Sequence, residues 1–311
     1  MAFSFFGGVH PKENKWYACD KETQVFPEPD IVVIPMSQHI GAPCNPLVKK
    51  GDPVTVGQKI GDNQGLCVPV HASVSGTVKA VEMRAHTSGT TVMSVVIEND
   101  HLDTLCEDIK PRTQEEVDAL STEELIGIIR EGGIVGMGGA AFPTNVKLDT
   151  SKLEEKPDTL IVNGAECEPY ITSDTRTMLD RSDELMEGAR LVQHFLQVRR
   201  VIFAIEDNKP RCIQLYRKLT KDEDGMEVCA LKSLYPQGGE KVLIYNTIGE
   251  IVPEGKLPLD VGAIVLNCTT LANIARYCRT GMPLVEKCIT VDGSAVAKPK
   301  NVIVPIGMKL A

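Results

Sequence analysis

Two different hydrophobic patterns divide the chain. Between residues 31 and 97, short β-branched runs alternate with glycine turns, which predicts strands at 31–34, 68–72, 76–81 and 91–97. From residue 121 onward, apolar residues recur at helical spacing between further β-branched runs. This second part predicts alternating strands and helices, and therefore a mainly parallel sheet covered on both faces.

The elements of the second part follow from local signals. Ser121 and Glu124 form a capping box before a helix, and Gly132 with Gly133 ends it. The further predicted strands are 159–163, 200–205, 226–232 and 263–266, and the further predicted helices are 182–197, 210–218 and 269–278. Because ligands of parallel sheets gather at the carboxyl ends of the strands, a site is expected there.

Four segments are expected along the chain. Residues 1–30, rich in proline, glycine and lysine, should form an extended arm. Residues 31–100 should form a small β domain and residues 101–285 an α/β domain. Residues 286–311 contain two strand-like runs, and a pair of strands alone is marginal in water. This last segment should therefore lean on the sheet domain or begin a domain that continues beyond residue 311.

The small β domain resembles a carrier domain without its carrier group. Segments 48–60 and 72–78 resemble the two halves of a biotinyl- or lipoyl-type barrel sandwich. A carrier needs an exposed lysine between these halves, but residues 61–67 contain none. We therefore expect a docking or structural module. His71 lies in one of the strands, where a histidine is more often packed than a metal ligand or an acid–base group.

Composition narrows the class of protein. Of the 311 residues, 42% are hydrophobic and 24% are charged, as in ordinary globular proteins. No apolar run approaches the roughly 20 residues that span a bilayer, and the N-terminus lacks the features of a signal peptide. A net charge of −9 and the lack of a basic run argue against nucleic-acid binding.

The cysteines show no ligand spacing. The ten cysteines fall at 19, 44, 67, 106, 167, 212, 229, 268, 278 and 288. No C-x-x-C pair occurs, so the spacings of a zinc ribbon and of a ferredoxin-type cluster are absent. Without export, disulfides are not expected. The sequence therefore predicts scattered, reduced thiols and no metal site.

Residues 136–147 have the composition of a phosphate-binding loop. A glycine cluster precedes Thr144, which can begin a helix, and Lys147 falls in the first turn. Glycines let a ligand approach bare backbone, and a helix start offers N–H groups and a positive dipole. The loop is neither a P-loop nor a G-x-G-x-x-G fingerprint. The alternative is a glycine-rich turn that lets a strand and a helix pack closely.

Polar residues also follow three of the predicted strands. Asn163, Glu166 and Glu168 come after the strand at 159–163, where they can hydrogen-bond the edge of a ligand. The alternative is a solvated acidic turn. The strand at 226–232 is followed by Tyr235, Gly238, Gly239 and Glu240. The glycines permit close approach of a ligand to the backbone, and Glu240 supplies a carboxylate. The alternative there is a plain strand–helix turn.

The last strand of the sheet domain ends in a third polar loop. Asn267 and Thr270 lie at the start of the helix at 269–278, where they can reach a phosphate or a ribityl hydroxyl. The alternative is an ordinary N-cap.

Together these loops resemble the NADH-binding flavoprotein subunit of respiratory complex I. Residues 136–147 read Gly-x-Gly-Gly-Ala-x-Phe-Pro-Thr-x-x-Lys, and residues 163–169, 235–240 and 267–273 are similar to three further flavin-site segments of that subunit. With Phe-Phe-Gly-Gly-Val-His-Pro at 5–11, the whole chain resembles the C subunit of Rnf electron-transport complexes. The chain departs from the complex I subunit at three positions, where it has Met137, Ala165 and Gly239.

The resemblance implies a function. It implies an FMN-binding α/β domain that exchanges hydride with NAD(H), in a complex that couples ferredoxin and NAD redox chemistry to ion translocation. The subunit would be peripheral, on the cytoplasmic side of the membrane, and bound to other subunits. The family's [4Fe–4S] clusters follow a β-grasp domain, so residues 286–311 would begin that domain and this chain would be the front part of a longer protein.

The resemblance also implies site residues. Glu168 and Glu240 are the expected catalytic groups, meeting the flavin edge and the nicotinamide amide, and Phe142 is expected to pack against adenine. The expected FMN-phosphate ligands are Gly138, Gly139, Lys147, Asn267 and Thr270. The full set of expected cofactor-binding residues is Gly136, Gly138, Gly139, Phe142, Lys147, Asn163, Glu166, Glu168, Tyr235, Gly238, Gly239, Asn267 and Thr270.

Two other functions remain open at this point. One is a different flavin- or NADH-dependent reductase, such as a cobalamin reductase, against which the arm and barrel before the glycine loop argue. The other is a non-catalytic docking subunit with a vestigial flavin site, which the residues Met137, Ala165 and Gly239 permit.

Overall fold

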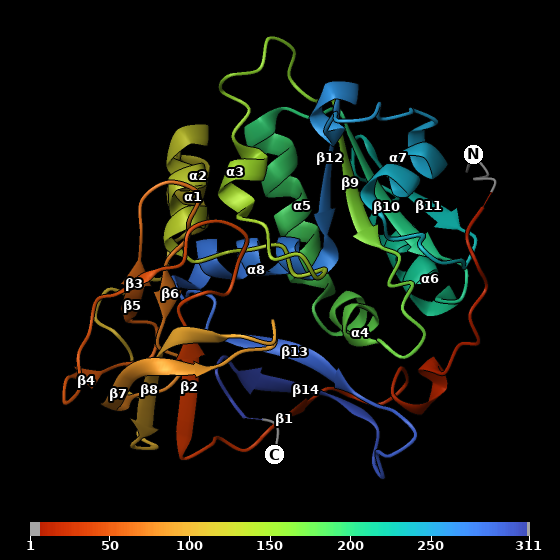
Figure 1. Cartoon of the computed structure of the whole chain (residues 1–311). Helices are drawn as coiled ribbons and strands as arrows, with labels where there is room; N and C mark the ends of the chain where they lie inside the picture. Colours follow the sequence, from red (N-terminus) through yellow and green to blue (C-terminus); the bar gives the residue numbers. More distant parts are fainter. Residues whose placement is uncertain (1–6, 310–311) are drawn as a thin grey trace. The chain divides into compact units, whose positions relative to one another are not determined.

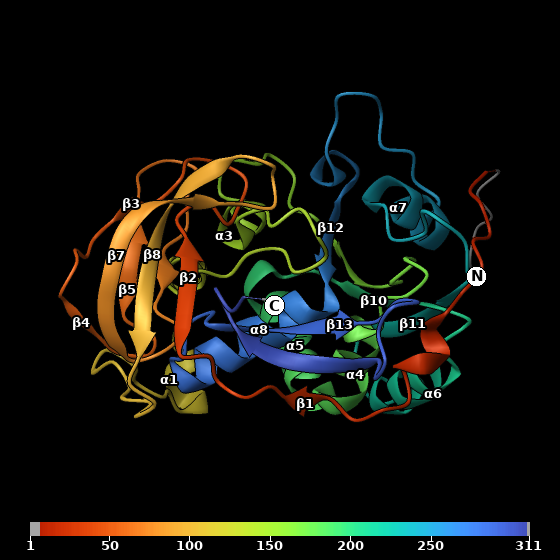
Figure 2. The ribbon, with the colours of Figure 1, turned by 60° about the horizontal axis from the view of Figure 1, so that its bottom comes forward.

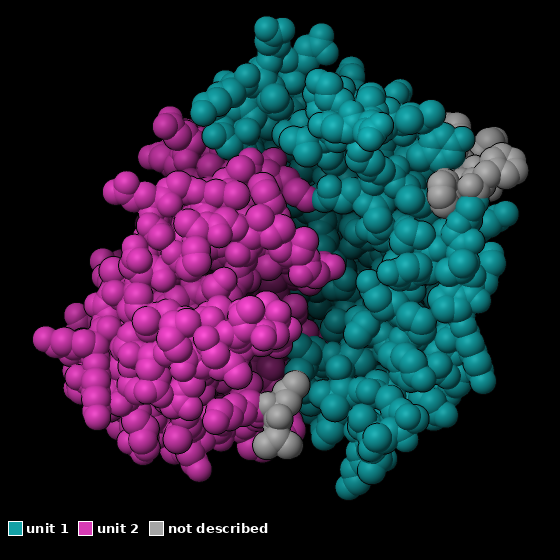
Figure 3. All heavy atoms as spheres, viewed as in Figure 1, with its two compact units in different colours: residues 1–24, 148–275, 289–302 teal, residues 25–147, 276–288, 303–311 magenta. Residues whose placement is uncertain are grey.

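The computed structural model describes residues 7–309 and divides the chain into two compact units (Figure 3). Unit 1 comprises the described parts of Met1–Gln24, Leu148–Ala275 and Ile289–Val302. Unit 2 comprises Val25–Lys147, Arg276–Cys288 and the described part of Ile303–Ala311. Phe5 and Phe6 of the predicted N-terminal motif, and the end of the predicted last domain, lie outside the described residues.

Unit 2 contains an antiparallel barrel sandwich. One sheet has the order β2-β8-β7-β4 and the other the order β3-β5-β6 (Figure 2). Their bounds are Ile31–Pro35 for β2, Asn45–Pro46 for β3, Pro53–Val54 for β4, Lys59–Asp62 for β5, Val70–His71 for β6, Gly76–Ala85 for β7 and Thr91–Asn99 for β8. The buried core includes Ile34, Ile60, Val78 and Ile97. The barrel sandwich predicted for this segment is confirmed.

Three short helices follow the sandwich along the chain. They are α1 (Gln114–Asp118), α2 (Thr122–Glu131) and α3 (Thr144–Leu148). The predicted capping box at the start of α2 is present, because Ser121 accepts from the backbone N–H of Glu124 and Glu124 accepts from that of Ser121. Gly132 caps the other end of α2, as predicted. Helix α1 was not predicted, although it carries a capping box of its own.

A parallel sheet forms the centre of unit 1 (Figure 1). Its order is β11-β10-β9-β12, and all three strand pairs are parallel, which confirms the predicted parallel sheet. The strands are β9 (Thr159–Gly164), β10 (Arg200–Glu206), β11 (Met226–Leu231) and β12 (Ala263–Asn267). The helices are α4 (Ser173–Asp180), α5 (Ser182–Leu196), α6 (Pro210–Leu219), α7 (Glu240–Ile248) and α8 (Cys268–Thr280), with a 3-10 turn, η2, at Pro258–Val261.

Helices cover both faces of this sheet, as the alternation predicted. On one face, Ile161 and Val265 pack with Leu243 of α7 in a single buried cluster. On the other face, the ring of Phe203 lies 5.0 Å from the ring of Tyr216 in α6, measured between centroids. The strand ends are thereby fixed in place, and the loops that follow them start from rigid positions.

The two strands predicted near the C-terminal end are present. They are β13 (Glu286–Val291) and β14 (Lys300–Pro305), and β1 (Gln24–Val25) joins them in a sheet of order β1-β14-β13. The predicted arm supplies β1 and a short 3-10 turn, η1, at Lys15–Tyr17. None of the helices in residues 7–309 is both long enough and apolar enough to cross a lipid bilayer.

Candidate functional site

The loops after β9 and β11 meet at the carboxyl edge of the sheet in unit 1. The side-chain amide of Asn163 donates to the backbone carbonyl of Gly238 over 3.0 Å. Its oxygen accepts from the backbone N–H of Ala165 at 3.1 Å, which turns the chain sharply after the strand. The Gly238 N–H in turn points at the sulfur of Cys167, 3.4 Å away. Two of the three predicted strand-end loops are therefore in direct contact.

Glu166 is an internal anchor of this edge. It is buried, and its carboxylate accepts from the backbone N–H of Asp174 at 2.7 Å and from the Thr175 hydroxyl at 2.6 Å. These contacts lie in the first turn of α4, where a negative charge is favoured. Burial raises the pKa of Glu166 to about 7, against the opposing influence of the Lys15 ammonium, whose nitrogen lies 3.8 Å away.

Asp174 connects Glu166 to the third loop. Its carboxylate accepts from the Asn267 side-chain amide at 2.6 Å and from the Thr269 hydroxyl at 2.7 Å. The Asn267 oxygen accepts from the backbone N–H groups of Thr269 and Thr270. Asn267 is thus the N-cap of α8, the alternative noted from the sequence, and Thr270 is fully buried behind it.

Glu168 has a different environment from Glu166, two residues earlier. Its side chain is exposed, whereas its backbone carbonyl accepts from the Lys15 ammonium at 2.7 Å. Lys15 also donates to the Ile171 carbonyl, and burial lowers its pKa. The loop after β9 is therefore fixed through its backbone while the Glu168 carboxylate faces solvent.

A second buried lysine supports the same loop. The Lys209 ammonium donates to the Ala165 carbonyl at 2.6 Å and pairs with the Glu206 carboxylate at 3.0 Å. Burial raises the pKa of Glu206, and the Lys209 charge opposes that rise. Neither Lys15 nor Lys209 was singled out from the sequence, because the backbone carbonyls that they bind are distant in the chain and no local motif marks them.

The loop after β11 is paired with the N-terminal arm. Val9 and Tyr235 exchange two backbone hydrogen bonds of 2.8 Å, and the Tyr235 side chain is half-exposed. The following peptide bond, to Pro236, is cis. Gly239 precedes α7, and Glu240, in its first turn, is partly buried. The predicted strand–helix turn is present.

The glycine loop lies in unit 2 and closes as a narrow turn. The N–H of Gly136 donates to the Phe142 carbonyl at 2.9 Å, and that of Thr144 donates to the Ile134 carbonyl at 3.1 Å. Between these bonds Gly138 and Gly139 are exposed, and Gly139 has a φ of 130° that only glycine adopts readily. Phe142 and Lys147 are both partly buried, and Lys147 lies in α3.

Several of these glycines are not required by the fold itself. A Cβ added at Gly136 would lie 3.6 Å from its nearest neighbours, and one at Gly238 would lie 3.5 Å from the Cys167 sulfur. These are ordinary contacts, and neither glycine has a positive φ. Close approach of a ligand to bare backbone explains both choices. The residues therefore fit a bound cofactor such as FMN.

Unsatisfied polar atoms beside the glycine loop point the same way. The Thr144 hydroxyl and the Asn145 side-chain oxygen are buried and have no hydrogen-bond partner within residues 7–309. Buried polar groups are normally satisfied. A hydroxyl of this kind can donate to a phosphate oxygen.

The predicted site residues thus fall into two sets. In unit 1, hydrogen bonds connect the loops that carry Asn163, Glu166, Glu168, Tyr235, Gly238, Gly239, Glu240, Asn267 and Thr270. Unit 2 holds Gly136, Gly138, Gly139, Phe142 and Lys147 on one loop. The individual roles of these residues stay predictions.

Comparison with known families identifies both parts of the chain. Residues 129–276 match the model of the Nuo51 FMN-binding domain, and residues 3–102 match the RnfC barrel sandwich hybrid domain. The two sets of predicted site residues both fall within the first of these matches. The predicted fold classes of both domains are confirmed.

Two curated relatives are similar over nearly the whole chain. The C subunit of the Na(+)-translocating ferredoxin:NAD(+) oxidoreductase complex of Acetobacterium woodii is 44% identical over 307 residues, which are 98% of this chain and 68% of the relative. The proton-translocating counterpart of Clostridium ljungdahlii is 43% identical over 308 residues, 99% of this chain and 66% of the relative. The chain thus spans about two thirds of the length of these relatives.

A solved structure supports the fold. A chain of an NAD+-reducing [NiFe]-hydrogenase in the air-oxidized state superposes with a TM-score of 0.50 at 19% identity, covering 60% of this chain and 37% of that one. The H2-reduced state of such a hydrogenase gives the same TM-score at 20% identity. At these identities the likeness concerns the fold alone. By its sequence identity to the curated relatives, the chain belongs to the RnfC family, the C subunits of ion-translocating ferredoxin:NAD(+) oxidoreductase complexes.

Proposed function

We propose that this chain binds FMN and exchanges hydride between FMN and NAD(H) as the C subunit of a complex that couples ferredoxin and NAD redox chemistry to ion translocation. The observation that carries the proposal is the match of residues 129–276 to an FMN-binding domain. The spare room at Gly136 and Gly238 supports it. The subunit works peripherally, on the cytoplasmic side of the membrane, in contact with other subunits.

The glycine loop is assigned to the phosphate. Gly138 and Gly139 expose bare backbone, the Thr144 hydroxyl is buried and unsatisfied, and Lys147 adds a positive charge. A charge-assisted hydrogen bond from a lysine to a phosphate is about twice as strong as a neutral one. One such loop holds one terminal phosphate, which favours FMN over FAD.

The loops after β9 and β11 are assigned to the reacting rings, while Asn267 and Thr270 after β12 keep their predicted place at the phosphate. Bound FMN supplies the hydride chemistry, and the protein binds and orients. Glu166 and the two buried lysines fix the loop after β9, so that the exposed Glu168 carboxylate can accept from a nicotinamide carboxamide. Glu240 is assigned to the same edge.

The one-electron carriers are placed outside this chain. No C-x-x-C pair occurs in the sequence, and the relatives extend over about half as much length again. We propose that the part of the family represented by this chain holds no [4Fe–4S] cluster of its own.

The test combines binding and reduction. Purified protein titrated with FMN and with FAD, followed by flavin fluorescence, should bind FMN more tightly. NADH added without oxygen should then bleach the visible flavin absorbance, and iron analysis should find no stoichiometric iron–sulfur. Glu168→Gln should slow the bleaching more than it weakens FMN binding, whereas Glu250→Gln, at an exposed position far along the chain, should change neither.

A docking subunit with a vestigial flavin site is the second candidate. Met137 favours this candidate. The complex I subunit has arginine at the corresponding position of the loop, whereas this chain has a methionine that is buried. FMN that binds but stays oxidised under excess NADH would support this candidate. Tighter binding of FAD than of FMN would instead remove the assignment of the glycine loop to a terminal phosphate.

A further inference from the structure

Three metal-ligand side chains converge in the barrel sandwich of unit 2. The sulfurs of Cys44 and Cys67 lie 3.5 Å apart, and the Nε2 atom of His39 lies 3.9 Å from the first and 3.6 Å from the second. Both cysteines are buried, and the histidine ring is partly exposed. No residue assigned to the flavin or nicotinamide belongs to this group.

These separations match a tetrahedral zinc site. With Zn–S bonds of about 2.3 Å and Zn–N bonds of about 2.0–2.1 Å, tetrahedral geometry places two sulfurs about 3.8 Å apart and a sulfur and a nitrogen about 3.6 Å apart. The three observed distances scatter around these values by a few tenths of an ångström. One ion could therefore bind all three atoms with small adjustments.

The surroundings of His39 favour the ligand form of its ring. Its Nδ1 lies 3.2 Å from the carbonyl of Ile40, so a proton on Nδ1 is held there by a hydrogen bond. This leaves Nε2 as an acceptor within reach of the two sulfurs, although it also accepts from the Val68 backbone N–H at 3.4 Å, a contact that a bound ion would replace. Histidines that bind metals commonly donate their other ring N–H to a carbonyl or carboxylate in this way.

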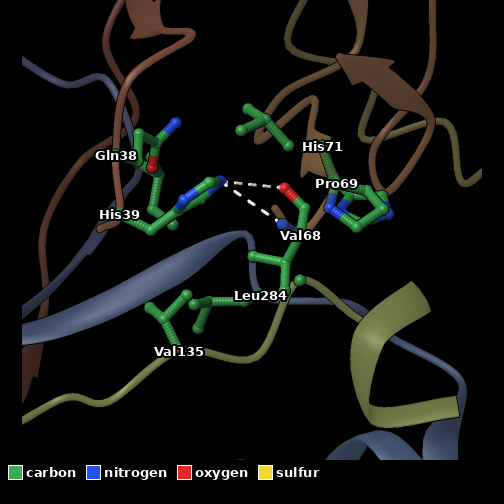
Figure 4. A pocket seen from close by; sticks show the side chains of 10 residues that line it. Gln38, His39, Val68, Pro69, His71, Val135 and Leu284 are labelled. Carbon is green, nitrogen blue, oxygen red and sulfur yellow. Dashed lines mark hydrogen bonds between the residues drawn. The ribbon is translucent and has the colours of Figure 1, made fainter. Parts of the chain in front are cut away.

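A fourth position lies beside the three side chains. In Figure 4 the His39 ring points toward the backbone of Val68, whose carbonyl oxygen is 3.2 Å from Nε2 and 3.3 Å from the Cys44 sulfur. The adjoining cavity of about 20 Å³ is lined by Gln38 and His71 among others. That volume holds about one water molecule. Water can thus complete a coordination sphere of four.

We propose that His39, Cys44 and Cys67 bind a zinc ion, with a water molecule or the Val68 carbonyl as the fourth ligand. Binding converts two thiols to thiolates and releases their two protons, with no change of oxidation state. The ion would connect two separate segments of the sandwich, the one from β2 to β3 that carries His39 and Cys44 and the one before β6 that carries Cys67. In a domain this small, a structural metal adds to a limited hydrophobic core.

Sequence spacing could not reveal this site. The two cysteines are 23 residues apart, and the histidine precedes Cys67 by 28. Cys44 comes just before β3, and Cys67 comes shortly before β6. The ligand set exists only after β3, β5 and β6 have paired. The expectation of no metal site rested on C-x-x-C spacing, which describes ligands within one turn.

The test uses metal analysis and a coloured probe. Protein purified without chelators should contain about one zinc per chain. Cobalt(II) exchanged for zinc should give the intense visible bands of a tetrahedral thiolate site. His39→Ala and Cys67→Ala should each weaken zinc binding by at least about 100-fold, more than typical losses from supporting residues. Cys106→Ser and Cys212→Ser, which alter cysteines outside the cluster, should leave zinc binding unchanged.

Circular dichroism of each variant checks that the fold persists. His39→Ala is the safer variant, because the side chain is partly exposed and its removal leaves no large core cavity. The proposal is overturned if the folded wild-type protein takes up no zinc, or if the cluster variants bind zinc as tightly as the controls do. Mass spectrometry that shows a native Cys44–Cys67 disulfide in protein prepared under reducing conditions would overturn it as well.

Discussion

At the scale of single residues, Glu166 and Glu168 are two positions apart in the sequence but differ in solvent exposure and in hydrogen bonding. Both follow the same strand, yet the Glu166 side chain is buried and accepts hydrogen bonds from α4, whereas the Glu168 side chain faces solvent. The backbone of Glu166 has a positive φ of 52°, which turns its side chain inward at some conformational cost. A buried anchor and an exposed carboxylate therefore occupy one short loop.

The buried carboxyl of Glu166 should make stability depend on pH. Its pKa rises from 4.5 to about 7 on folding, so between these values the native state holds a proton that the unfolded chain has released. The contribution of Glu166 to the free energy of unfolding is therefore fully present below pH 4.5. It declines by up to about 3 kcal/mol as the pH rises to 7. Urea unfolding across pH 5–8 should show the decline, and Glu166→Gln should flatten it. An equal slope in the variant would assign the effect to another group.

Lys147 should matter for the cofactor and not for the fold. Lys147→Ala should weaken FMN binding by about 1–3 kcal/mol if its ammonium binds the phosphate. Lys152→Ala removes a nearby exposed charge and should have little effect. Fluorescence titration at two salt concentrations measures both variants. Equal affinities would place Lys147 outside the phosphate site.

At the scale of elements, the long ones were predictable and the short ones were not. Helix α5 and the four parallel strands follow from apolar periodicity, whereas α1 has 5 residues and α4 has 8, too few for a period to show. Helix α4 matters for the site, because its first turn receives the Glu166 carboxylate. The element that anchors the candidate site was therefore one that the sequence did not reveal.

Two glycines in unit 1 should respond oppositely to a methyl group. At Gly188 in α5 a Cβ would lie 2.1 Å from the Leu271 carbonyl oxygen of α8, so Gly188→Ala should destabilise the fold by about 1–3 kcal/mol or more. At Gly238 there is room, so Gly238→Ala should leave stability unchanged or raise it by up to about 1 kcal/mol.

Measuring FMN affinity together with stability distinguishes a glycine needed for the fold from one needed for cofactor binding. Gly238→Ala should weaken FMN binding by about tenfold or more, because the methyl group enters the space assigned to the cofactor. Thermal unfolding with and without FMN measures both quantities in one experiment. A stable Gly238→Ala protein with unchanged FMN affinity would remove this loop from the site.

At the scale of the whole molecule, the barrel sandwich should carry no covalent group. The hairpin that would present a carrier lysine instead contains Asp62, whose carboxylate accepts from the Arg130 guanidinium at 2.7 Å. The intact mass of protein purified from a host with active lipoyl and biotinyl ligases should equal that of the bare polypeptide. A lipoyl or biotinyl increment would contradict this reading.

What the sequence could predict was local, and what it could not predict was distant. Both domain types and the parallel sheet are confirmed, since they rest on periodicity and short motifs. The two buried lysines that fix the loop after β9 could not be predicted. Lys15 contacts a carbonyl 153 residues away in the chain, and Lys209 contacts one 44 residues away. No pattern within a window of residues carries such a pairing, and the same is true of the His39–Cys44–Cys67 cluster.

The division of each unit among separate segments has a consequence for synthesis on the ribosome. The His10 ring contacts the Ser233 carbonyl, 223 residues later, and Val9 pairs with Tyr235. At about 5–20 residues per second, the N-terminal arm leaves the ribosome roughly 10–45 s before these partners are made. During that interval the arm cannot form its native contacts with residues 233 and 235. Unit 1 therefore cannot place its N-terminal arm until synthesis has passed residue 235, so the arm is made first but is among the last segments to reach its native contacts.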